Sequence, residues 1–184
     1  MKHTLNVLTL TALAAAASAQ TAPAAGLNYN QVGISRTSRQ NAVTAQGVLG
    51  GSSLLIGLQS TSDEGSGDNT PSITLGYIFR GVTQGIDATI FVQQAQWENT
   101  AYGITLRRSL NEVYAGLEIS ASYAGTLASN GDSYIALGGS SFWATSVNNV
   151  ELSYNVNKTF AVAVGLTKGN YNNRQTVFSV RAGF

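Results

Sequence analysis

The side chains that most enzymes use for nucleophilic or acid–base chemistry are nearly missing from this sequence. Its single histidine is His3, and it contains no cysteine. A Ser-His-acid triad and a cysteine nucleophile therefore both lack an essential residue in the rest of the chain. Zinc sites lose their usual ligands for the same reason. Paired carboxylates are the remaining acid–base option, and we predict no enzymatic activity and no cofactor.

Two groups of charged residues deserve interpretation. The stretch 63–69 is rich in carboxylates and glycine, but its spacing differs from that of an EF-hand loop, so we interpret it as a solvated turn and predict no metal site. Five other charges share the polar side of the alternating segments described below. They are Arg107, Glu112, Glu118, Glu151 and Arg181. If that side lines an interior, two interpretations stay open: an ion-pair network that fills the interior, or a constriction that tunes solute passage.

Composition limits the class of protein that can carry these residues. Charged residues make up 10% of the chain, while 43% are hydrophobic and 20 are glycine; an average soluble protein has about 25% charged residues. Nine basic and nine acidic residues remain once Lys2 is removed, with no basic cluster that would indicate nucleic-acid binding. No later segment reaches about 18 consecutive apolar residues, which excludes membrane helices. A closed β-barrel is the other structure that satisfies every backbone polar group in lipid.

The N-terminus has the form of a secretory signal peptide. Lys2 and His3 give a positive start, an apolar stretch follows at 5–16, and 17–19 (Ala-Ser-Ala) fits a small-x-small cleavage site. The apolar stretch is shorter than the roughly 20 residues of a spanning helix, which disfavours an N-terminal anchor. We expect a signal peptide at 1–19, a flexible leader at 20–26 and a single barrel domain at 27–184.

After residue 26, apolar residues alternate with small or polar ones at period two, which is typical of strands with one apolar face. Ten strands are predicted, at 27–36, 41–49, 53–62, 71–80, 85–97, 101–108, 112–123, 148–156, 159–168 and 174–184. An eight-stranded barrel, with two of these segments rejected, is the alternative. Gln94 and Gln96 fall on the apolar face of the fifth segment, so that strand is expected to bulge or to leave the bilayer there.

The predicted connections alternate between short and long, as in outer-membrane barrels. Short turns at 50–51, 81–84, 110–111 and 157–158 are expected on the periplasmic side, and the longer connections outside. The segment from Ala124 to Asn149 contains a strand-like stretch, from Ser133 to Trp143. Because an eleventh strand would break antiparallel closure, we interpret the segment as a folded outside loop or hairpin, and its dipping into the mouth of the barrel stays open.

Alternation alone leaves open which face meets lipid, because a soluble lipocalin-like barrel has the same period with its apolar face inside. Lys158 and Lys168 are the only lysines after the signal, whereas a soluble outer face carries many charges. Aromatic residues also gather at predicted strand ends, as in the two aromatic girdles of membrane barrels. They are Phe79, Phe160 and Phe184 at one rim, and Trp97, Tyr102 and Tyr123 at the other.

The last predicted strand carries a resemblance to a known family. Phe184 is preceded at alternate positions by Phe178, Val180 and Ala182, which resembles the assembly signal of outer-membrane β-barrels. More broadly, the chain is similar to small porin-like outer-membrane β-barrel proteins, whose hairpins repeat motifs such as Leu-Gly-Tyr at 75–77. The resemblance implies an all-β, antiparallel up-and-down transmembrane barrel that the barrel assembly machinery reads through its last strand. Barrel enzymes that resemble this chain use a histidine as base.

From these observations, the expected function is a structural or surface-interaction role in the cell envelope. The alternative is a narrow porin-like channel for small solutes, and a secreted soluble ligand-binding barrel is the least favoured. The expected location is the outer membrane, after signal-dependent export. Expected partners are outer-membrane lipid, the assembly machinery, and surface polysaccharide or envelope proteins reached through outside loops; no nucleic acid is expected.

Overall fold

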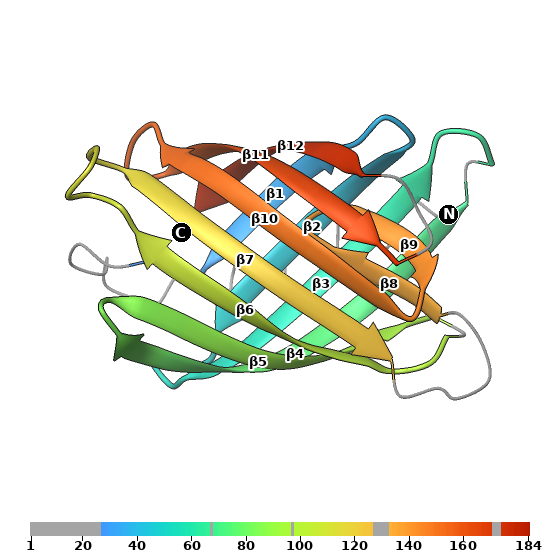
Figure 1. Cartoon of the computed structure of the whole chain (residues 1–184), viewed down its shortest axis with the longest axis horizontal. Helices are drawn as coiled ribbons and strands as arrows, with labels where there is room; N and C mark the ends of the chain where they lie inside the picture. The colour runs from blue at the N-terminus through green and yellow to red at the C-terminus, as the bar shows by residue number, and fades with distance from the viewer. Residues whose placement is uncertain (1–26, 67, 97, 127–132, 171–173) are drawn as a thin grey trace.

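The computed structural model describes residues 27–66, 68–96, 98–126, 133–170 and 174–184. Within these ranges the chain forms ten β-strands in a closed antiparallel barrel and two more in a separate hairpin (Figure 1). No helix in the described ranges is long and apolar enough to cross a bilayer. The predicted signal peptide and leader, 1–26, lie outside the described residues.

The wall strands run around the barrel in sequence order. They are β1 (Gln31–Arg36), β2 (Gln40–Val48), β3 (Leu54–Asp63), β4 (Asn69–Thr83), β5 (Ile86–Ala95), β6 (Ala101–Ser109), β7 (Leu117–Thr126), β10 (Ser146–Asn155), β11 (Phe160–Gly169) and β12 (Gln175–Gly183). The first and last strands pair with each other, with Ile34 opposite Val180, and so leave no open edge. The ten-strand prediction is confirmed, and the eight-stranded alternative is wrong.

The wall exposes its apolar side chains and buries its polar ones. Leu152 and Val164 are partners across β10 and β11 and are 42% and 43% exposed. Their neighbours Glu151 and Ser153 point to the other face and are buried. Period-two alternation therefore places an apolar band outside and a polar lining inside, as a membrane barrel requires and as a soluble barrel does not.

Exposed aromatic residues lie near both ends of the barrel. We call the end where β1 begins and β12 finishes the terminal end, and the opposite one the hairpin end. Phe79 and Phe160 are exposed near the terminal end, and Tyr102 and Tyr123 near the hairpin end. This matches the predicted rims, except that Phe184 is only partly exposed and Trp97 lies outside the described residues.

Three strand boundaries differ from the predicted ones for local reasons. Strand β7 begins at Leu117 instead of 112, because residues 110–116 form a turn that closes at Gly116, whose φ of +85° favours glycine. Strand β5 keeps its alternation, ends at Ala95 and does not bulge, and the Gln96 amide still donates a 3.0 Å hydrogen bond to the Pro71 carbonyl of β4. The register shift lies in β4 instead, between Phe79 and Thr83.

The third difference concerns the start of the barrel. Strand β1 begins at Gln31, and residues 27–30, predicted as strand, precede it as an irregular segment. The Asn28 side chain accepts a hydrogen bond from the Asn30 backbone amide at 2.9 Å, and the Asn30 side chain accepts one from the Val48 amide at 2.8 Å. Asparagine side chains that bond to nearby backbone compete with strand pairing, and here they turn the chain away from the ladder.

Candidate functional site

Residues 133–144, between β7 and β10, lie in the lumen. Their two strands, β8 (Ser133–Leu137) and β9 (Ser140–Ala144), form a hairpin that lies at the end of the barrel where β7 finishes (Figure 1). Strand β8 contacts β5, β7 and β10, whereas β9 contacts β2 and β11. Wall strands from different sides of the barrel can meet one hairpin only if the hairpin lies inside. Residues 133–144 thus take the hairpin form of the predicted segment, and this hairpin lies within the barrel.

Apolar packing holds this hairpin against one part of the wall. Ile135 and Phe142 are fully or almost fully buried. They belong to one apolar cluster with wall residues that also point inward, namely Phe91, Ala101, Ala124 and Val147. These wall residues interrupt an otherwise polar lining, so the lumen carries an apolar patch at the place where the hairpin docks.

The hairpin tip approaches the wall at β10 and β1. Gly138 and Gly139 have φ values of +59° and +78°. A Cβ atom added to Gly138 would lie 2.6 Å from Nδ2 of Asn149 on β10, and one added to Gly139 would lie 1.8 Å from Oγ of Ser35 on β1. Both the backbone conformation and the close approach therefore require glycine. The Ser141 amide also donates a 2.8 Å hydrogen bond to Oε1 of Gln40 on β2.

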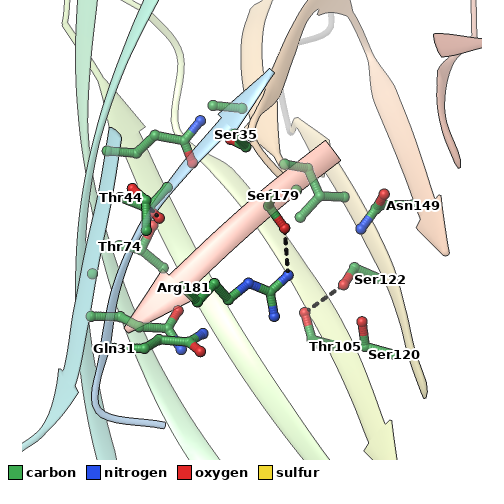
Figure 2. Close-up of a pocket in the computed structure, with 18 of the residues that line it drawn as sticks. Gln31, Ser35, Thr44, Thr74, Thr105, Ser120, Ser122, Asn149, Ser179 and Arg181 are labelled. Atoms are coloured by element: carbon green, nitrogen blue, oxygen red, sulfur yellow. Dashed lines mark hydrogen bonds between the residues drawn. The ribbon is translucent and has the colours of Figure 1, made fainter. Parts of the chain in front are cut away.

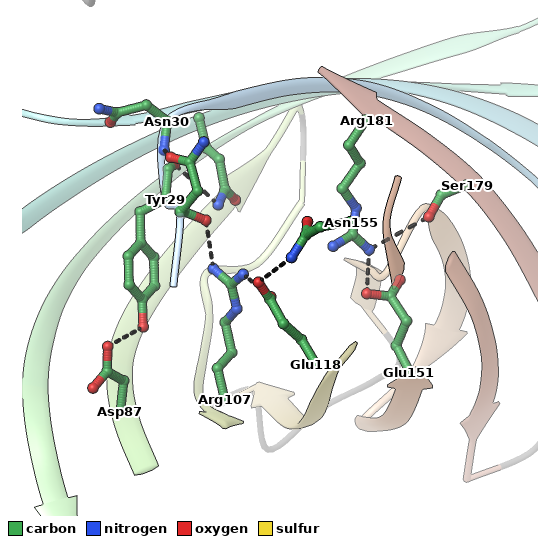
Figure 3. A network of polar contacts seen from close by, with 11 residues as sticks. Tyr29, Asn30, Asp87, Arg107, Glu118, Glu151, Asn155, Ser179 and Arg181 are labelled. Atoms are coloured by element: carbon green, nitrogen blue, oxygen red, sulfur yellow. Dashed lines mark hydrogen bonds and ion pairs between the residues drawn. The ribbon is translucent and has the colours of Figure 1, made fainter. Parts of the chain in front are cut away.

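Residues 27–30, which we call the N-terminal insert, occupy the lumen at the terminal end. Tyr29 is 5% exposed, and its hydroxyl donates a 3.0 Å hydrogen bond to Oδ2 of Asp87. The Arg107 guanidinium lies 4.6 Å from the centre of the Tyr29 ring and donates to the Asn28 carbonyl at 2.9 Å (Figure 3). Burial is the main cause that raises the pKa of Tyr29 well above its ordinary value, so the phenol stays a hydrogen-bond donor.

Two ion pairs lie on the lumenal side of the wall above this insert, one between the neighbouring strands β6 and β7 and one between β12 and β10. Nη2 of Arg107 lies 2.8 Å from Oε2 of Glu118, whose other oxygen accepts a 2.7 Å hydrogen bond from the Asn155 amide. Arg181 pairs with Glu151, and both side chains are largely buried (Figure 3). The structure thus brings four of the five predicted lumenal charges into the interior, as two pairs.

Glu112 is the predicted charge that does not join them. It lies in the 110–116 turn, outside β7, and its Oε1 is 2.7 Å from Nη2 of Arg108. The Glu112 side chain is 54% exposed. The predicted placement was wrong because continuing the period through 112–116 ignored the positive φ of Gly116, which breaks the alternation.

Between the hairpin and the two ion pairs lies a cavity of about 200 Å³, which we call the chamber. Its top is formed by residues 136–139 of the hairpin, and its lower part by Tyr29, Arg107 and Arg181. Hydroxyl and amide side chains make up much of the wall, and Figure 2 shows them pointing into one space from several strands. Examples are Gln31, Thr44, Thr74, Ser120 and Ser122.

Sequence reasoning missed several residues that shape this site. Phe91 carried a usable signal, because it is a large apolar residue at a position whose neighbours in the alternation, Thr89 and Gln93, are polar. Asp87 shares that inward side and was not assigned to the charge network. Tyr29 carried no usable signal, since its partners Asp87 and Arg107 come from β5 and β6, far from it in the sequence.

The acidic stretch near residue 63 makes ordinary side-chain contacts. Asp63 accepts a hydrogen bond from Nε2 of Gln40 at 2.5 Å, and Glu64 pairs with Arg36 at 2.6 Å. In the ranges that the structure describes, no group of three or more His, Cys, Asp or Glu side chains could hold a metal ion.

The closed ten-stranded wall, its apolar outer band and its polar lumen define a small β-barrel of the transmembrane type. No protein-family model matches the sequence, and no curated protein matches it. Among solved structures, the chain is similar to the KdgM porin, with a TM-score of 0.49, 10% identity, and coverage of 84% of this chain and 98% of that one. It is also similar to the outer-membrane protein Omp33 of Acinetobacter baumannii, with a TM-score of 0.47, 10% identity, and coverage of 86% and 100%.

A second structure of the KdgM porin, in complex with disordered oligogalacturonate, gives the same TM-score of 0.49 and 10% identity. At this identity the likeness concerns the fold alone. What this barrel holds or passes must therefore be inferred from its own lumenal residues.

Proposed function

We propose that this protein is a narrow outer-membrane channel for small hydrophilic solutes. The observation that carries the proposal is the polar chamber inside a closed barrel, between the hairpin and the ion pairs of Arg107 and Arg181. The proposal includes export through the signal peptide at 1–19. It also includes recognition by the assembly machinery of the last strand, where Phe178 and Val180 face outward.

The size of the lumen supports a small solute. Ten strands enclose an interior only slightly wider than one that side chains fill completely. Here two inserted segments take up part of that interior and leave a cavity of about 200 Å³, which is the volume of about seven water molecules at about 30 Å³ each. A barrel with only a structural role has no need of a polar cavity, because apolar or ion-paired side chains can fill its centre.

The competing function is a purely structural or surface-interaction barrel. The observation that favours it is the presence of inserted segments at both ends of the lumen, the hairpin at one and residues 27–30 at the other. Conductance separates the two functions, because a structural barrel needs no continuous aqueous path.

The test is single-channel recording of the purified protein in planar bilayers, beside a variant in which residues 133–144 are replaced by a short Gly-Ser linker. We expect small, discrete conductance steps for the native chain and steps several-fold larger for the variant, because the variant lacks the lumenal hairpin. Circular dichroism and heat-modifiable migration check that both barrels are folded. Folded protein that never conducts, with or without the hairpin, would exclude the channel and favour the structural role.

A further inference from the structure

Two polar atoms at the top of the chamber have no hydrogen-bond partner. They are Oγ of Ser35 on β1 and Oδ1 of Asn149 on β10. Ser35 is 9% exposed and Asn149 is 5% exposed, and both line the chamber. A buried polar atom without a partner costs free energy, and native structures contain few of them. Because these two atoms have no hydrogen-bond partner in the chain, they indicate that a hydrogen-bonding group of a bound solute occupies the top of the chamber.

The hairpin tip covers both atoms without bonding to them. Gly138 approaches the Asn149 side chain, and Gly139 approaches the Ser35 hydroxyl. Two consecutive glycines permit backbone conformations that other residues disfavour, so the tip can shift at low cost. A small shift would open the two atoms to whatever occupies the chamber below.

The charges of the chamber are already neutralised by one another. In the described part of the chain, the charged residues that line it are Arg107, Glu151 and Arg181. Arg181 pairs with Glu151, and Arg107 pairs with Glu118 directly beside the chamber. A charged solute would have to break one of these pairs or enter without a counter-charge, and either step is unfavourable in a confined space.

The rest of the wall offers neutral donors and acceptors. Thr105 and Ser122 bond to each other at 2.9 Å, and the side chains of Gln31, Thr44 and Thr74 point into the same space (Figure 2). The cavity of about 200 Å³ is smaller than the roughly 300–1,000 Å³ of sites for drug-sized ligands. Size and chemistry together fit one compact molecule with several hydroxyl groups.

We propose that the chamber is a binding site for an uncharged, polyhydroxylated solute the size of a single sugar ring. Hydroxyl and amide side chains of the wall bind the ring, and Ser35 and Asn149 supply two further hydrogen bonds once the glycine tip shifts. The proposed site specifies the class of solute for the proposed channel. It rests on the proposed function in one respect, which is that solute must reach the lumen.

The first test compares three sugars that share one ring and differ in charge. Isothermal titration calorimetry of the detergent-solubilised full mature chain would use glucose, glucosamine and glucuronate at neutral pH. We expect glucose to bind at least ten-fold more tightly than either charged analogue. Equal or tighter binding of glucosamine or glucuronate would overturn the proposal, and so would the absence of glucose binding.

The second test compares three alanine variants, two inside the chamber and one control outside it. Ser35→Ala removes an unpartnered hydroxyl inside the chamber, and Asn149→Ala removes the other unpartnered group. Ser72→Ala is the control, because its hydroxyl is also buried and unpartnered but does not line the chamber. We expect glucose affinity to fall roughly five- to ten-fold in each chamber variant and to stay unchanged in Ser72→Ala. Equal affinities in all three variants would overturn the role of Ser35 and Asn149.

The two proposals fail in different experiments. Calorimetric binding of glucose by a protein that never conducts would overturn the channel and leave the site. Conductance that glucose does not reduce, together with no calorimetric binding, would overturn the site and leave the channel.

Discussion

The barrel wall and the hairpin inside it are both antiparallel β-structure, yet they are stabilised in different ways. On the wall, apolar side chains such as Val164 face outward and the ladder closes on itself between β1 and β12. On the hairpin, Ile135 and Phe142 are buried against inward-pointing wall residues, and the two strands pair only with each other. The wall depends on closure and lipid, whereas the hairpin depends on a local apolar patch.

Because of this difference, the lumenal segments can be loosened separately from the wall. The hairpin contributes no strand to the closed ladder, and neither does the N-terminal insert at 27–30. Variants in these segments should therefore change access to the chamber before they change the stability of the barrel. Variants on the outer face should change the stability of the barrel before they change access to the chamber.

Phe142→Ala should have the largest effect, and it should be local. Replacing a buried phenylalanine with alanine destabilises by about 3–5 kcal/mol, and here the free energy of hairpin docking is the quantity that decreases. The readout is labelling of Ser140→Cys by a maleimide, since Ser140 is fully buried and the chain has no native cysteine. Labelling should accelerate by about a hundred-fold or more, while the urea midpoint of the barrel stays nearly constant. If Phe142→Ala lowered the free energy of barrel unfolding as much as the free energy of hairpin docking, the hairpin and the barrel would form one cooperative unit.

Val164→Arg tests the wall. Val164 is exposed in the middle of β11, and an arginine near the bilayer midplane costs about 2–4 kcal/mol. Ile119→Arg is the matched control, because Ile119 is also exposed but lies near the start of β7, toward the terminal end. Reversible urea unfolding in lipid vesicles should show a smaller decrease in the free energy of unfolding for Ile119→Arg than for Val164→Arg. A harmless Val164→Arg would show that the outer face does not meet lipid.

Arg181→Gln tests the ion pair between Arg181 and Glu151, two residues that line the chamber. It leaves the Glu151 carboxylate, whose side chain is 7% exposed, without its partner. An unsatisfied buried acceptor costs about 1–3 kcal/mol, and the lumen gains a negative charge that should favour cations over anions in reversal-potential measurements. Adding Glu151→Gln should restore neutrality and part of the stability. If the two losses simply add in this double-mutant cycle, the pair contributes no coupling.

Tyr29→Phe should have the smallest effect. It removes the hydrogen bond to Asp87 and keeps the ring beneath Arg107, so about 0.5–1.5 kcal/mol should be lost on urea unfolding. The raised pKa of Tyr29 means that the native state holds its proton where the unfolded state releases it. Native stability should therefore fall as pH rises above the ordinary value of 10.0, and Tyr29→Phe should reduce that fall. An unchanged pH profile in the variant would show that Tyr29 does not cause it.

Much of the wall could be predicted because its determinants are local. Period-two alternation, glycine turns such as Gly50-Gly51 with φ of +53° and +73°, and the scarcity of charge each depend on neighbouring residues. The prediction of lumenal charges at Arg107, Glu118, Glu151 and Arg181 used the same period, and all four point inward. Glu112 was misplaced where a single glycine interrupts the period.

Only the tertiary structure decided what fills the lumen. Residues 133–144 look partly strand-like in the sequence, and their place inside depends on the patch formed by Phe91 on β5 and the paired residues Ala124 and Val147 on β7 and β10. The inward turn of Tyr29 depends on Asp87 and Arg107 in the same way. By itself, the sequence determined a closed barrel with an apolar outside, because alternation is a property of each strand. The two ion pairs depend on strand pairing, because Arg107 and Glu118 lie on the adjacent strands β6 and β7, and β11 alone separates Arg181 from Glu151. The chamber depends on closure, because only the pairing of β1 with β12 encloses a lumen.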